Sequence, residues 1–394
     1  MAPRAPMANW LNDTNDVTAV FLAAGQIPDL INLAGGLPAP DAWPVTEISE
    51  LAGEVVRDYP AETLTYSPVP GLPRLRDVLA ERYSTPTLPL TRDNVMITTG
   101  GAQALDLIGK VLLEPGQKIA AQSPAYLGAL DAWRPRTPVY APMHLEDPAC
   151  DITAAMTGAQ FAYTVPNFSN PSGRLVPVAQ RKALLAAAQE TGAWLVEDDP
   201  YGKLYYDGNP LPTMLEMSAT GKSYDGPVIY LGTVSKELAP GLRIGWIIAA
   251  PEMIAALTVA KQGSDMFSSG LCQMIAARAY SEGLADRILP ANLELYRRRR
   301  DALCTAMDEH LSDFLTWEKP SGGMFVWARV KNPAIATDAL MKVGLEHGVC
   351  ISPSSVFDPE GLDQSGIRLN FTLNEPEQLT EGVRRLAKAL SEMQ

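Results

Sequence analysis

Residues 228–249 form the most informative segment of the chain, VIYLGTVSKELAPGLRIGWIIA. Two mainly apolar runs, 228–232 and 243–249, have the composition of buried strands, and a polar turn with Lys236 lies between them. A lysine at a strand end, desolvated beside another cation, has a depressed pKa and can act as an imine-forming amine. Arg243 supplies such a cation and can bind a phosphate in a bidentate manner. For an arbitrary lysine, a surface position in a loop is the commoner alternative.

Working outward from this segment, short β-branched runs alternate with longer runs of helical period from Asn94 onward. Such alternation is typical of βαβ units around a largely parallel sheet, so the expected fold class is α/β. Strands are predicted at 94–98, 118–122, 160–164, 193–197, 228–232 and 243–249, and helices at 102–113, 177–191 and 251–263.

The pattern changes after residue 284. A long helix is expected at 284–310, followed by Gly322-Gly323, short strands and a terminal helix, which indicates a second domain. The first 60 residues are rich in Pro and Gly and suit an extended arm. We therefore expect an N-terminal arm with part of the small domain at 1–60, a large domain at 61–290 and a C-terminal small domain at 291–394. An anion or nucleic-acid patch is one interpretation of the basic run 297–300, but the acidic total favours a solvated helix face.

Length and composition indicate a compact protein of two or three domains. The chain has 394 residues, of which 46% are hydrophobic and 20% are charged, close to the averages of globular proteins. The formal net charge is −13, which argues against a nucleic-acid partner and favours small molecules as ligands.

Cysteine, histidine and hydropathy patterns argue against three further features. The four cysteines form no CxxC pair and the three histidines have no metal-site spacing, so neither disulfides nor a metal centre are expected. The apolar stretch 244–260 is interrupted by Pro251 and Glu252, so we expect no membrane span. The apolar segment 17–25 resembles the core of a signal peptide, but acidic residues precede it where a signal peptide is basic. A cytoplasmic location is therefore expected.

Two further segments place polar groups where strands end. Gly100-Gly101-Ala102-Gln103 opens a helix whose free N–H groups favour a phosphate, although glycines also simply turn a strand into a helix. Glu197-Asp198-Asp199-Pro200-Tyr201 ends another strand, and a buried carboxylate there needs a cation, such as an arginine or a protonated heterocycle nitrogen. A helix N-cap is the alternative role for that carboxylate.

Seven separated positions occur in one order along the chain: Gly100, Asn170 in Asn170-Pro171-Ser172-Gly173, Asp198 with Tyr201, Lys236, Arg243 and Arg368. In order and local context they resemble the pyridoxal-phosphate-dependent aminotransferases of fold type I, class I/II. Within that class, segments 32–38, 321–327 and 368–371 are most similar to the branch containing 2-aminoadipate and multisubstrate aminotransferases. The resemblance covers nearly the whole chain. It implies an aspartate-aminotransferase-like α/β fold, with a mostly parallel seven-stranded sheet flanked by helices and a smaller α+β domain.

The resemblance also implies catalytic roles. Lys236 is the expected Schiff-base lysine, which holds pyridoxal 5′-phosphate and moves the proton between the substrate Cα and the cofactor. Asp198 is expected to pair with the pyridinium nitrogen, and the family spacing of three residues before Tyr201 disfavours Asp199. Tyr201 and Asn170 are expected to hydrogen-bond the phenolic oxygen, and Tyr126 to stack on the ring. The expected phosphate contacts are Gly101, the backbone amides of Ala102 and Gln103, Thr233, Ser235 and Arg243.

On the substrate side, the resemblance implies that Arg368 binds the α-carboxylate in a fork that lysine cannot replicate, beside Asn170. Gly36 would let the backbone approach the substrate. Tyr66 belongs to a segment that, in the family, reaches into the neighbouring subunit's active site, so a homodimer is expected.

The segment 17–22 departs from the aminoadipate-type members, which carry an arginine there that can meet a distal acid. We therefore expect a preference for apolar or aromatic side chains. Pro200 also departs from the usual small residue between the aspartate and the tyrosine, which stiffens the local turn.

The predicted reaction is amino-group transfer from an L-amino acid, apolar, aromatic or of broad range, to a 2-oxo acid such as 2-oxoglutarate, with ping-pong kinetics. Other carbanion chemistry on the same cofactor, namely β-elimination, racemisation or decarboxylation, is the alternative within enzymes. A non-catalytic sensor domain is the alternative from another class, but the regulators that contain one need an additional basic N-terminal module.

Overall fold

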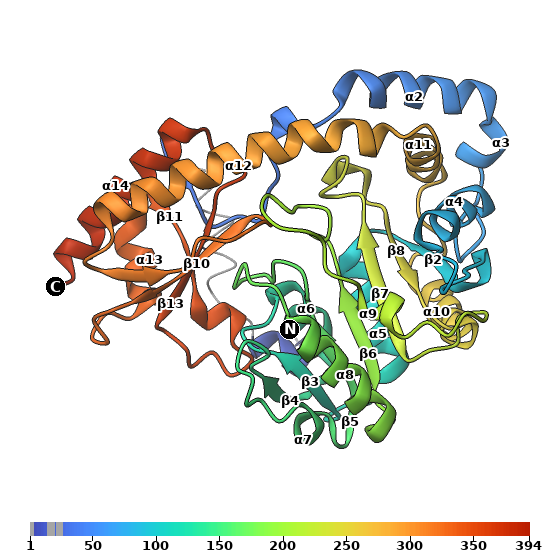
Figure 1. The fold of residues 1–394 in the computed structure, drawn as a ribbon, viewed down its shortest axis with the longest axis horizontal. Helices are drawn as coiled ribbons and strands as arrows, with labels where there is room; N and C mark the ends of the chain where they lie inside the picture. The colour runs from blue at the N-terminus through green and yellow to red at the C-terminus, as the bar shows by residue number, and fades with distance from the viewer. Residues whose placement is uncertain (1–3, 14–19, 21–26) are drawn as a thin grey trace.

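The computed structural model describes residues 4–13, 20 and 27–394, and its central feature is a seven-stranded sheet (Figure 1). Across the sheet the strands follow the order β2-β8-β7-β6-β5-β3-β4. Within this sheet β8 is antiparallel to both of its neighbours and the other pairs are parallel, so the predicted mostly parallel sheet is confirmed. The strands are β2 (Val95–Thr98), β3 (Lys118–Gln122), β4 (Val139–Met143), β5 (Ala159–Thr164), β6 (Trp194–Asp198), β7 (Val228–Thr233) and β8 (Gly245–Ile248).

Strand β4 is the one that the sequence pattern does not predict. It forms an edge of the sheet and pairs with β3 alone, and Val139 at its start is 58% exposed. It also contains Pro142, which an edge strand tolerates because one side of its backbone needs no partner. The half-exposed, proline-containing run therefore lacks the composition of a buried strand.

Helices cover both faces of the sheet because alternate residues of each strand point to opposite sides. In β5, Phe161 and Tyr163 belong to one buried core, whereas Ala162 belongs to the other. The first core includes residues of α5 (Gly101–Leu112), α6 (Leu127–Trp133) and α10 (Pro251–Gln262). The second includes residues of α4 (Pro73–Tyr83), α7 (Ile152–Met156), α8 (Val178–Thr191), α9 (Met214–Met217) and α11 (Gly270–Ser281).

The ends of α8 illustrate how local sequence sets these elements. Pro177 precedes the first turn, where its missing N–H costs no hydrogen bond. Gly192 ends the helix at a φ of 75°, and its N–H donates to the carbonyl of Ala188. A left-handed residue at this position favours glycine, which has no Cβ. The predicted helix 177–191 thus coincides with α8, as 102–113 and 251–263 do with α5 and α10 within one residue.

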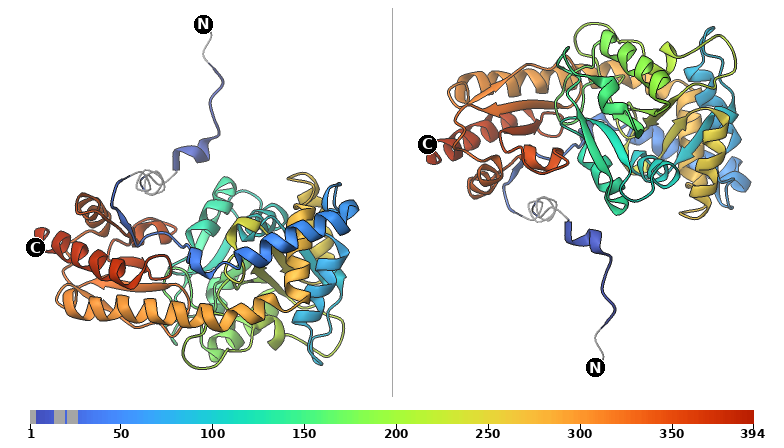
Figure 2. Two further views of the ribbon diagram at one scale, coloured as in Figure 1. Left: turned by 90° about the horizontal axis from the view of Figure 1, so that it is seen from above. Right: turned by 90° about the horizontal axis from the view of Figure 1, so that it is seen from below.

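A smaller α+β unit lies beside the large sheet (Figures 1 and 2). Its antiparallel sheet has the order β12-β13-β10-β9, and β1 (Ile31–Asn32) pairs in parallel with β11 (Val349–Cys350). The chain therefore returns residues near its start to the C-terminal unit. The other elements are β9 (Leu315–Trp317), β10 (Phe325–Val330), β12 (Ser352–Pro353), β13 (Gly366–Asn370), α12 (Leu284–His310), α13 (Thr337–Glu346) and α14 (Pro376–Glu392).

The first 60 residues are only partly extended. Residues 4–13, with η1 (Asn9–Asp13), stand away from the body of the molecule (Figure 2). Residues 45–58 form the helix α2 (Val45–Asp58), which packs on α11. The domain boundaries at 60 and 290 stay predictions, and residue 290 lies inside the continuous helix α12. The remaining short elements are η2 (Pro40–Ala42), α3 (Pro60–Thr63), η3 (Arg92–Asn94), η4 (Arg134–Arg136), η5 (Pro240–Leu242) and η6 (Ser354–Phe357).

The basic run on α12 is not the solvated face that the sequence suggests. Arg299 and Arg300 are buried. Arg299 pairs with Asp41 and Glu375, and Arg300 pairs with Asp207 and Asp301. Three of these four partners, Asp41, Asp207 and Glu375, are distant in sequence. The local pattern therefore does not indicate that Arg299 and Arg300 are buried in ion pairs.

The described part of the chain lacks two features, a helix that could span a membrane and a side-chain group that could bind a metal ion. None of its helices combines the length and apolarity that crossing a bilayer requires. Its His, Cys, Asp and Glu side chains form no group of three that could hold a metal ion.

Candidate active site

All predicted site residues except Gln103 and Tyr66 line one cavity of about 540 Å³ beyond the carboxyl ends of β5, β6 and β7. Open α/β sheets bind ligands at this edge because the loops that follow the strands diverge there. A second cavity, of about 600 Å³, lies around Arg174 and Trp317, and its wall includes no predicted site residue. The predicted residues in the wall of the first cavity are Gly36, Gly101, Ala102, Tyr126, Asn170, Asp198, Tyr201, Thr233, Ser235, Lys236, Arg243 and Arg368.

Lys236 follows β7 and points its amine into this cavity. Its Nζ donates a hydrogen bond of 2.9 Å to the carbonyl of Gly36, and no described carboxylate forms an ion pair with it. Burial lowers the pKa of Lys236 to about 8, and the nearby cations Arg368 and Arg243 contribute to that decrease. The amine is therefore substantially neutral in mildly alkaline solution, as a nucleophile requires.

Three consecutive buried carboxylates, Glu197 and Asp198 at the end of β6 and Asp199 directly after it, have three different surroundings. Glu197 accepts from the backbone N–H groups of Met214 and Leu215, at 2.8 and 2.9 Å. Asp199 accepts from Asn167 and Tyr230 on the side of the sheet away from the cavity. Only Asp198 of the three lines the cavity. The geometry thus agrees with the spacing that favours Asp198 over Asp199.

The Asp198 carboxylate has one described side-chain donor, the hydroxyl of Tyr163, at 2.9 Å from Oδ2. Burial raises the pKa of Asp198 to about 7, and the hydrogen bond from Tyr163 opposes that rise. A cation placed in the cavity next to Asp198 would restore the charged form. The sequence argument missed Tyr163, whose side chain lies in the same buried core as Phe161 and reaches Asp198 on the adjacent strand.

Arg368 also lines the cavity, where two aromatic rings and three hydrogen-bond acceptors hold its guanidinium. Its guanidinium lies 4.4 Å from the ring centre of Phe325 and 4.8 Å from that of Phe357. Nη1 donates to Oδ1 of Asn170 at 2.6 Å, and Nη2 donates to Ser352 and to the carbonyl of Ala34.

Arg368 also lacks a counter-ion. Its Nε is buried without a partner, and within the described residues no acidic group forms an ion pair with it. Burial lowers its pKa to about 10. A buried guanidinium without a carboxylate is a site for an anion, because an unpaired buried charge is costly.

A second anion site, which we call the phosphate corner, lies at the start of α5 and consists of Gly100, Gly101, Ala102 and Arg243. Gly100 has a φ of 80°, which favours glycine because other residues are strained there, and a Cβ at this position would lie 2.4 Å from Nη2 of Arg243, so the guanidinium would have to move. Gly101 and Ala102 begin the helix at the cavity wall, where their N–H groups lack intrahelical partners. The exposed Arg243 guanidinium and these amides together favour a phosphate.

Two polar groups complete this corner. The hydroxyls of Thr233 and Ser235 are 2.9 Å apart, and the Ser235 N–H donates to Thr233. Gln103 does not line the cavity. Its side-chain oxygen instead accepts from the N–H of Thr99 and from Lys261, so the structure gives Gln103 a side-chain contact that the sequence argument did not assign.

Tyr126 and Tyr201 bring aromatic rings to the cavity. A Cβ on Gly128 would lie 2.5 Å from the Tyr126 ring, so the small residue at 128 leaves room for that ring. The Tyr201 hydroxyl is within 3.5 Å of the Asn170 amide, a long hydrogen bond. Burial raises the pKa of both tyrosines, so they are neutral hydrogen-bonding groups near pH 7.

Tyr66, like Gln103, is a predicted site residue that lies outside the cavity wall. It is 78% exposed, and its ring contacts Phe267 edge-on, with the ring centres 5.4 Å apart. Leu64, close to it in sequence, and Met266, the neighbour of Phe267, are also exposed, at 68% and 52%. Apart from Val20, the segment 17–22 lies outside the described residues.

One known protein family matches most of this chain. The model of the family "Aminotransferase class I and II" matches residues 28–386. Aromatic-amino-acid aminotransferase 1 of Thermococcus litoralis is 38% identical over 383 residues, which cover 93% of this chain and 89% of that protein.

Two solved structures are similar to this chain over almost its full length. The multiple substrate aminotransferase from Thermococcus profundus has a TM-score of 0.89 and 35% identity, and the match covers 98% of both chains. LysN, the alpha-aminoadipate aminotransferase from Thermus thermophilus, complexed with N-(5′-phosphopyridoxyl)-L-leucine, has a TM-score of 0.87 and 32% identity. That match covers 98% of this chain and 99% of the LysN chain.

Proposed function

The chain belongs to the class I and II aminotransferases and is a pyridoxal-phosphate-dependent transaminase, and we propose that it prefers apolar and aromatic L-amino acids as donors and a 2-oxo acid such as 2-oxoglutarate as acceptor. The observation that carries the proposal is the cavity itself, whose wall combines a neutralisable amine, Lys236, with the carboxylate of Asp198 and the uncompensated guanidinium of Arg368.

The residues present fit the cofactor. The Gly100–Arg243 corner offers an exposed cation and helix N–H groups to a phosphate, and Asp198 offers a buried carboxylate to a ring nitrogen. The hydroxyl of Tyr201 and the amide of Asn170 lie together at the wall and would hydrogen-bond the phenolic oxygen. When bound, pyridoxal phosphate supplies an electron sink for the substrate Cα.

Lys236 would hold the cofactor through its amine and, once a substrate amine replaces it, act as the general base and acid. Its pKa of about 8 leaves a useful fraction neutral near pH 7.5. The neutral Nζ would take the proton from the substrate Cα and deliver it to the adjacent cofactor carbon. Arg368 and Arg243 support this role because each cation disfavours protonation of the amine.

Asp198 would keep a ring nitrogen protonated by pairing with it, and Tyr163 would hold the carboxylate charged and oriented. Tyr126 would cover one ring face. Arg368 would bind the substrate α-carboxylate, with its position set by Phe325 and Phe357 rather than by a flexible loop.

Charge in the rest of the cavity wall supports the proposed preference for apolar side chains. The described cations in the wall are Lys236, Arg243 and Arg368, each with a proposed role. Besides Asp198, the described acidic group in the wall is Asp131, which shares a face of α6 with Leu127 at a spacing of four residues. A distal carboxylate would therefore meet another carboxylate, whereas an apolar or aromatic group would meet Leu37, Leu105 and Leu127.

We also propose that the working unit is a homodimer in which Tyr66 contributes to the neighbouring site. Support comes from its 78% exposure and from the exposed Leu64 and Met266, because an apolar surface of this kind is stabilised when a partner covers it. A cytoplasmic location, inferred from the acidic residues before segment 17–25, stays a prediction that cell fractionation tests.

A donor panel tests the proposed reaction. Purified enzyme, loaded with pyridoxal phosphate, would be mixed with single amino acids without an acceptor. Transfer predicts one equivalent of 2-oxo acid per site and no free ammonia. Ammonia with pyruvate would instead indicate β-elimination, D-amino acid would indicate racemisation, and carbon dioxide would indicate decarboxylation. A strong preference for 2-aminoadipate or glutamate over phenylalanine and leucine would refute the proposed specificity.

A further inference from the structure

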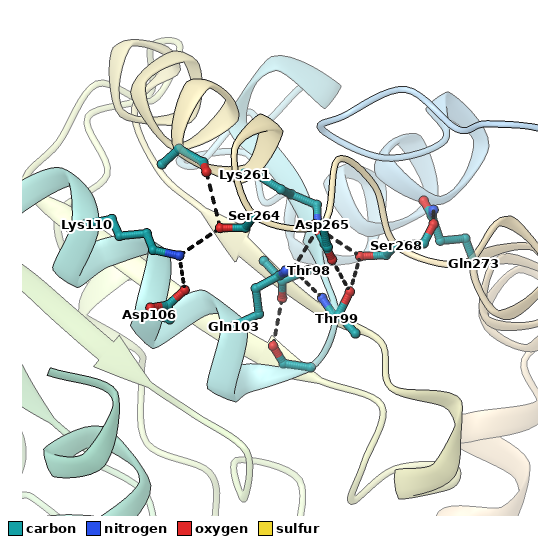
Figure 3. A network of polar contacts seen from close by, with 12 residues as sticks. Thr98, Thr99, Gln103, Asp106, Lys110, Lys261, Ser264, Asp265, Ser268 and Gln273 are labelled. Atoms are coloured by element: carbon teal, nitrogen blue, oxygen red, sulfur yellow. Dashed lines mark hydrogen bonds and ion pairs between the residues drawn. The ribbon is translucent and has the colours of Figure 1, made fainter. Parts of the chain in front are cut away.

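Lys261, in the last turn of α10, is fully buried, although no part of the reaction described above requires it. Its ammonium donates three hydrogen bonds, to Oε1 of Gln103 at 2.6 Å, to Oδ1 of Asp265 at 2.7 Å and to Oγ of Ser268 at 3.2 Å (Figure 3). All of its donors are therefore used. Burial lowers the pKa of Lys261, and the ion pair with Asp265 opposes that effect.

All three partners of Lys261 also contact Thr99, the residue before Gly100. Oε1 of Gln103 accepts from the Thr99 N–H at 2.8 Å. The Thr99 hydroxyl donates to Oδ2 of Asp265 at 2.7 Å and lies 2.9 Å from the Ser268 hydroxyl. The Thr99 carbonyl accepts from Arg243 at 3.4 Å. A single ammonium thus organises the groups that restrain the start of the phosphate corner (Figure 3).

We propose that Lys261 is a positioning residue for cofactor binding, which holds the turn from Thr99 to Ala102 in the conformation that directs its N–H groups toward the cofactor phosphate. The turn needs such a restraint because Gly100 and Gly101 have many accessible backbone conformations, and fixing them opposes binding unless the fold has already done so. This inference rests on the proposed placement of the phosphate at this corner.

The effect is one of geometry rather than of charge. Lys261 and Asp265 form an ion pair with no net charge, so the pair adds little to the potential at the phosphate. Removing the ammonium would leave Gln103, Asp265 and Ser268 without their shared donor, and the buried groups would rearrange around Thr99.

The same network reaches the exposed surface around Tyr66. Asp265 and Ser268 lie on the loop 263–268, whose Phe267 packs against Tyr66. The loop 263–268 therefore contacts both Thr99, at the start of the phosphate corner, and the surface proposed to meet a second subunit.

Binding of two ligands to apoenzyme tests the role of Lys261. Pyridoxal phosphate engages the corner, whereas pyridoxal, which lacks the phosphate, does not. In Lys261→Met the dissociation constant of pyridoxal phosphate should rise about tenfold or more, the range expected when buried polar groups lose a partner. The dissociation constant of pyridoxal should change less than about twofold, because the other contacts are intact. The rate of pyridoxal phosphate release from holoenzyme should rise in parallel.

Lys110→Met is the matched control. Lys110 also pairs with a carboxylate four residues away, Asp106, at 2.7 Å, and it donates to Ser264 on the same loop, but it does not contact Thr99 (Figure 3). Its removal should leave both dissociation constants unchanged.

Thr99→Val tests the same restraint from the other end, because it removes the hydroxyl and keeps the side-chain shape. It should weaken pyridoxal phosphate binding selectively as well, and it decides the question if Lys261→Met does not fold. Unchanged affinity for pyridoxal phosphate in the folded variants, or equal weakening of both ligands, would overturn the proposal. Wild-type protein that binds no pyridoxal phosphate would instead refute the cofactor site itself.

Discussion

The hydroxyl of Tyr163 donates a 2.9 Å hydrogen bond to Oδ2 of Asp198, and the two side chains extend from the adjacent parallel strands β5 and β6. A donated hydrogen bond stabilises the charged carboxylate and lowers its pKa, whereas burial raises that pKa to about 7. The balance between these effects determines how much of Asp198 is charged near neutral pH.

Tyr163→Phe should therefore raise the pKa of Asp198 further. The acid limb of the kcat/KM profile should move to higher pH, and kcat/KM at pH 7 should fall about tenfold, as expected for a lost hydrogen bond to a charged group. The control is Tyr230→Phe, which removes the equivalent donor of Asp199, outside the cavity. Its profile should keep its midpoints, and a shift of equal size in both variants would contradict a specific role for Tyr163.

The amine of Lys236 should titrate well below an ordinary lysine. In apoenzyme, its acetylation at a series of pH values, quantified by mass spectrometry, should show a midpoint near pH 8. Arg368→Gln removes a nearby cation that opposes protonation, so the midpoint should move upward. Arg243→Gln should move it in the same direction by less, because Arg243 has the smaller effect. A midpoint that neither variant changes would show that burial alone sets this pKa.

Arg368→Lys should weaken binding of every amino acid by a similar factor, because all share the α-carboxylate. Loss of the fork at a buried charge pair costs on the order of 2 to 5 kcal/mol, so kcat/KM should fall by at least about 30-fold. The decrease should appear mainly in KM, and kcat/KM for phenylalanine and leucine measures it. A loss confined to one of these donors would indicate that Arg368 recognises the side chain instead.

Asp131→Asn should increase activity toward acidic donors. The change removes a negative charge from the cavity wall and frees Arg134, which pairs with Asp131 at 2.7 Å. The ratio of kcat/KM for glutamate to that for phenylalanine should rise about threefold to tenfold, a modest value because the pair is partly exposed. Asp106→Asn, which removes an exposed carboxylate on α5 outside the cavity wall, is the control and should leave the ratio unchanged.

Subunit complementation tests the role of Tyr66. Lys236→Ala and Tyr66→Ala would each be purified, then mixed and allowed to exchange subunits. If Tyr66 serves the neighbouring site, each hybrid dimer has one complete site, and activity should recover to about one quarter of wild type. If Tyr66 acts within its own chain, the mixture should show no recovery. Size measurement of wild-type protein separately establishes whether a dimer forms.

Much of this molecule follows from local sequence. The alternation of apolar runs and helical periods predicted six of the seven strands of the large sheet, because the periods of strands and helices are properties of the backbone itself. Strand β4 escaped the pattern because an edge strand has only one neighbour and tolerates Pro142. The ordered set from Gly100 to Arg368 indicated the family, since each motif combines a turn with a specific chemical group.

Tertiary packing decided what those residues meet. Spacing favoured Asp198 over Asp199, but only the folded chain shows that Asp198 faces the cavity and that Tyr163 donates to it. Likewise, no pattern in α10 shows that Lys261 is buried and shares its hydrogen-bond partners with Thr99, 162 positions earlier in the chain. A side chain's own chemistry is encoded locally, whereas its burial and its partners depend on which distant segments the fold packs against it.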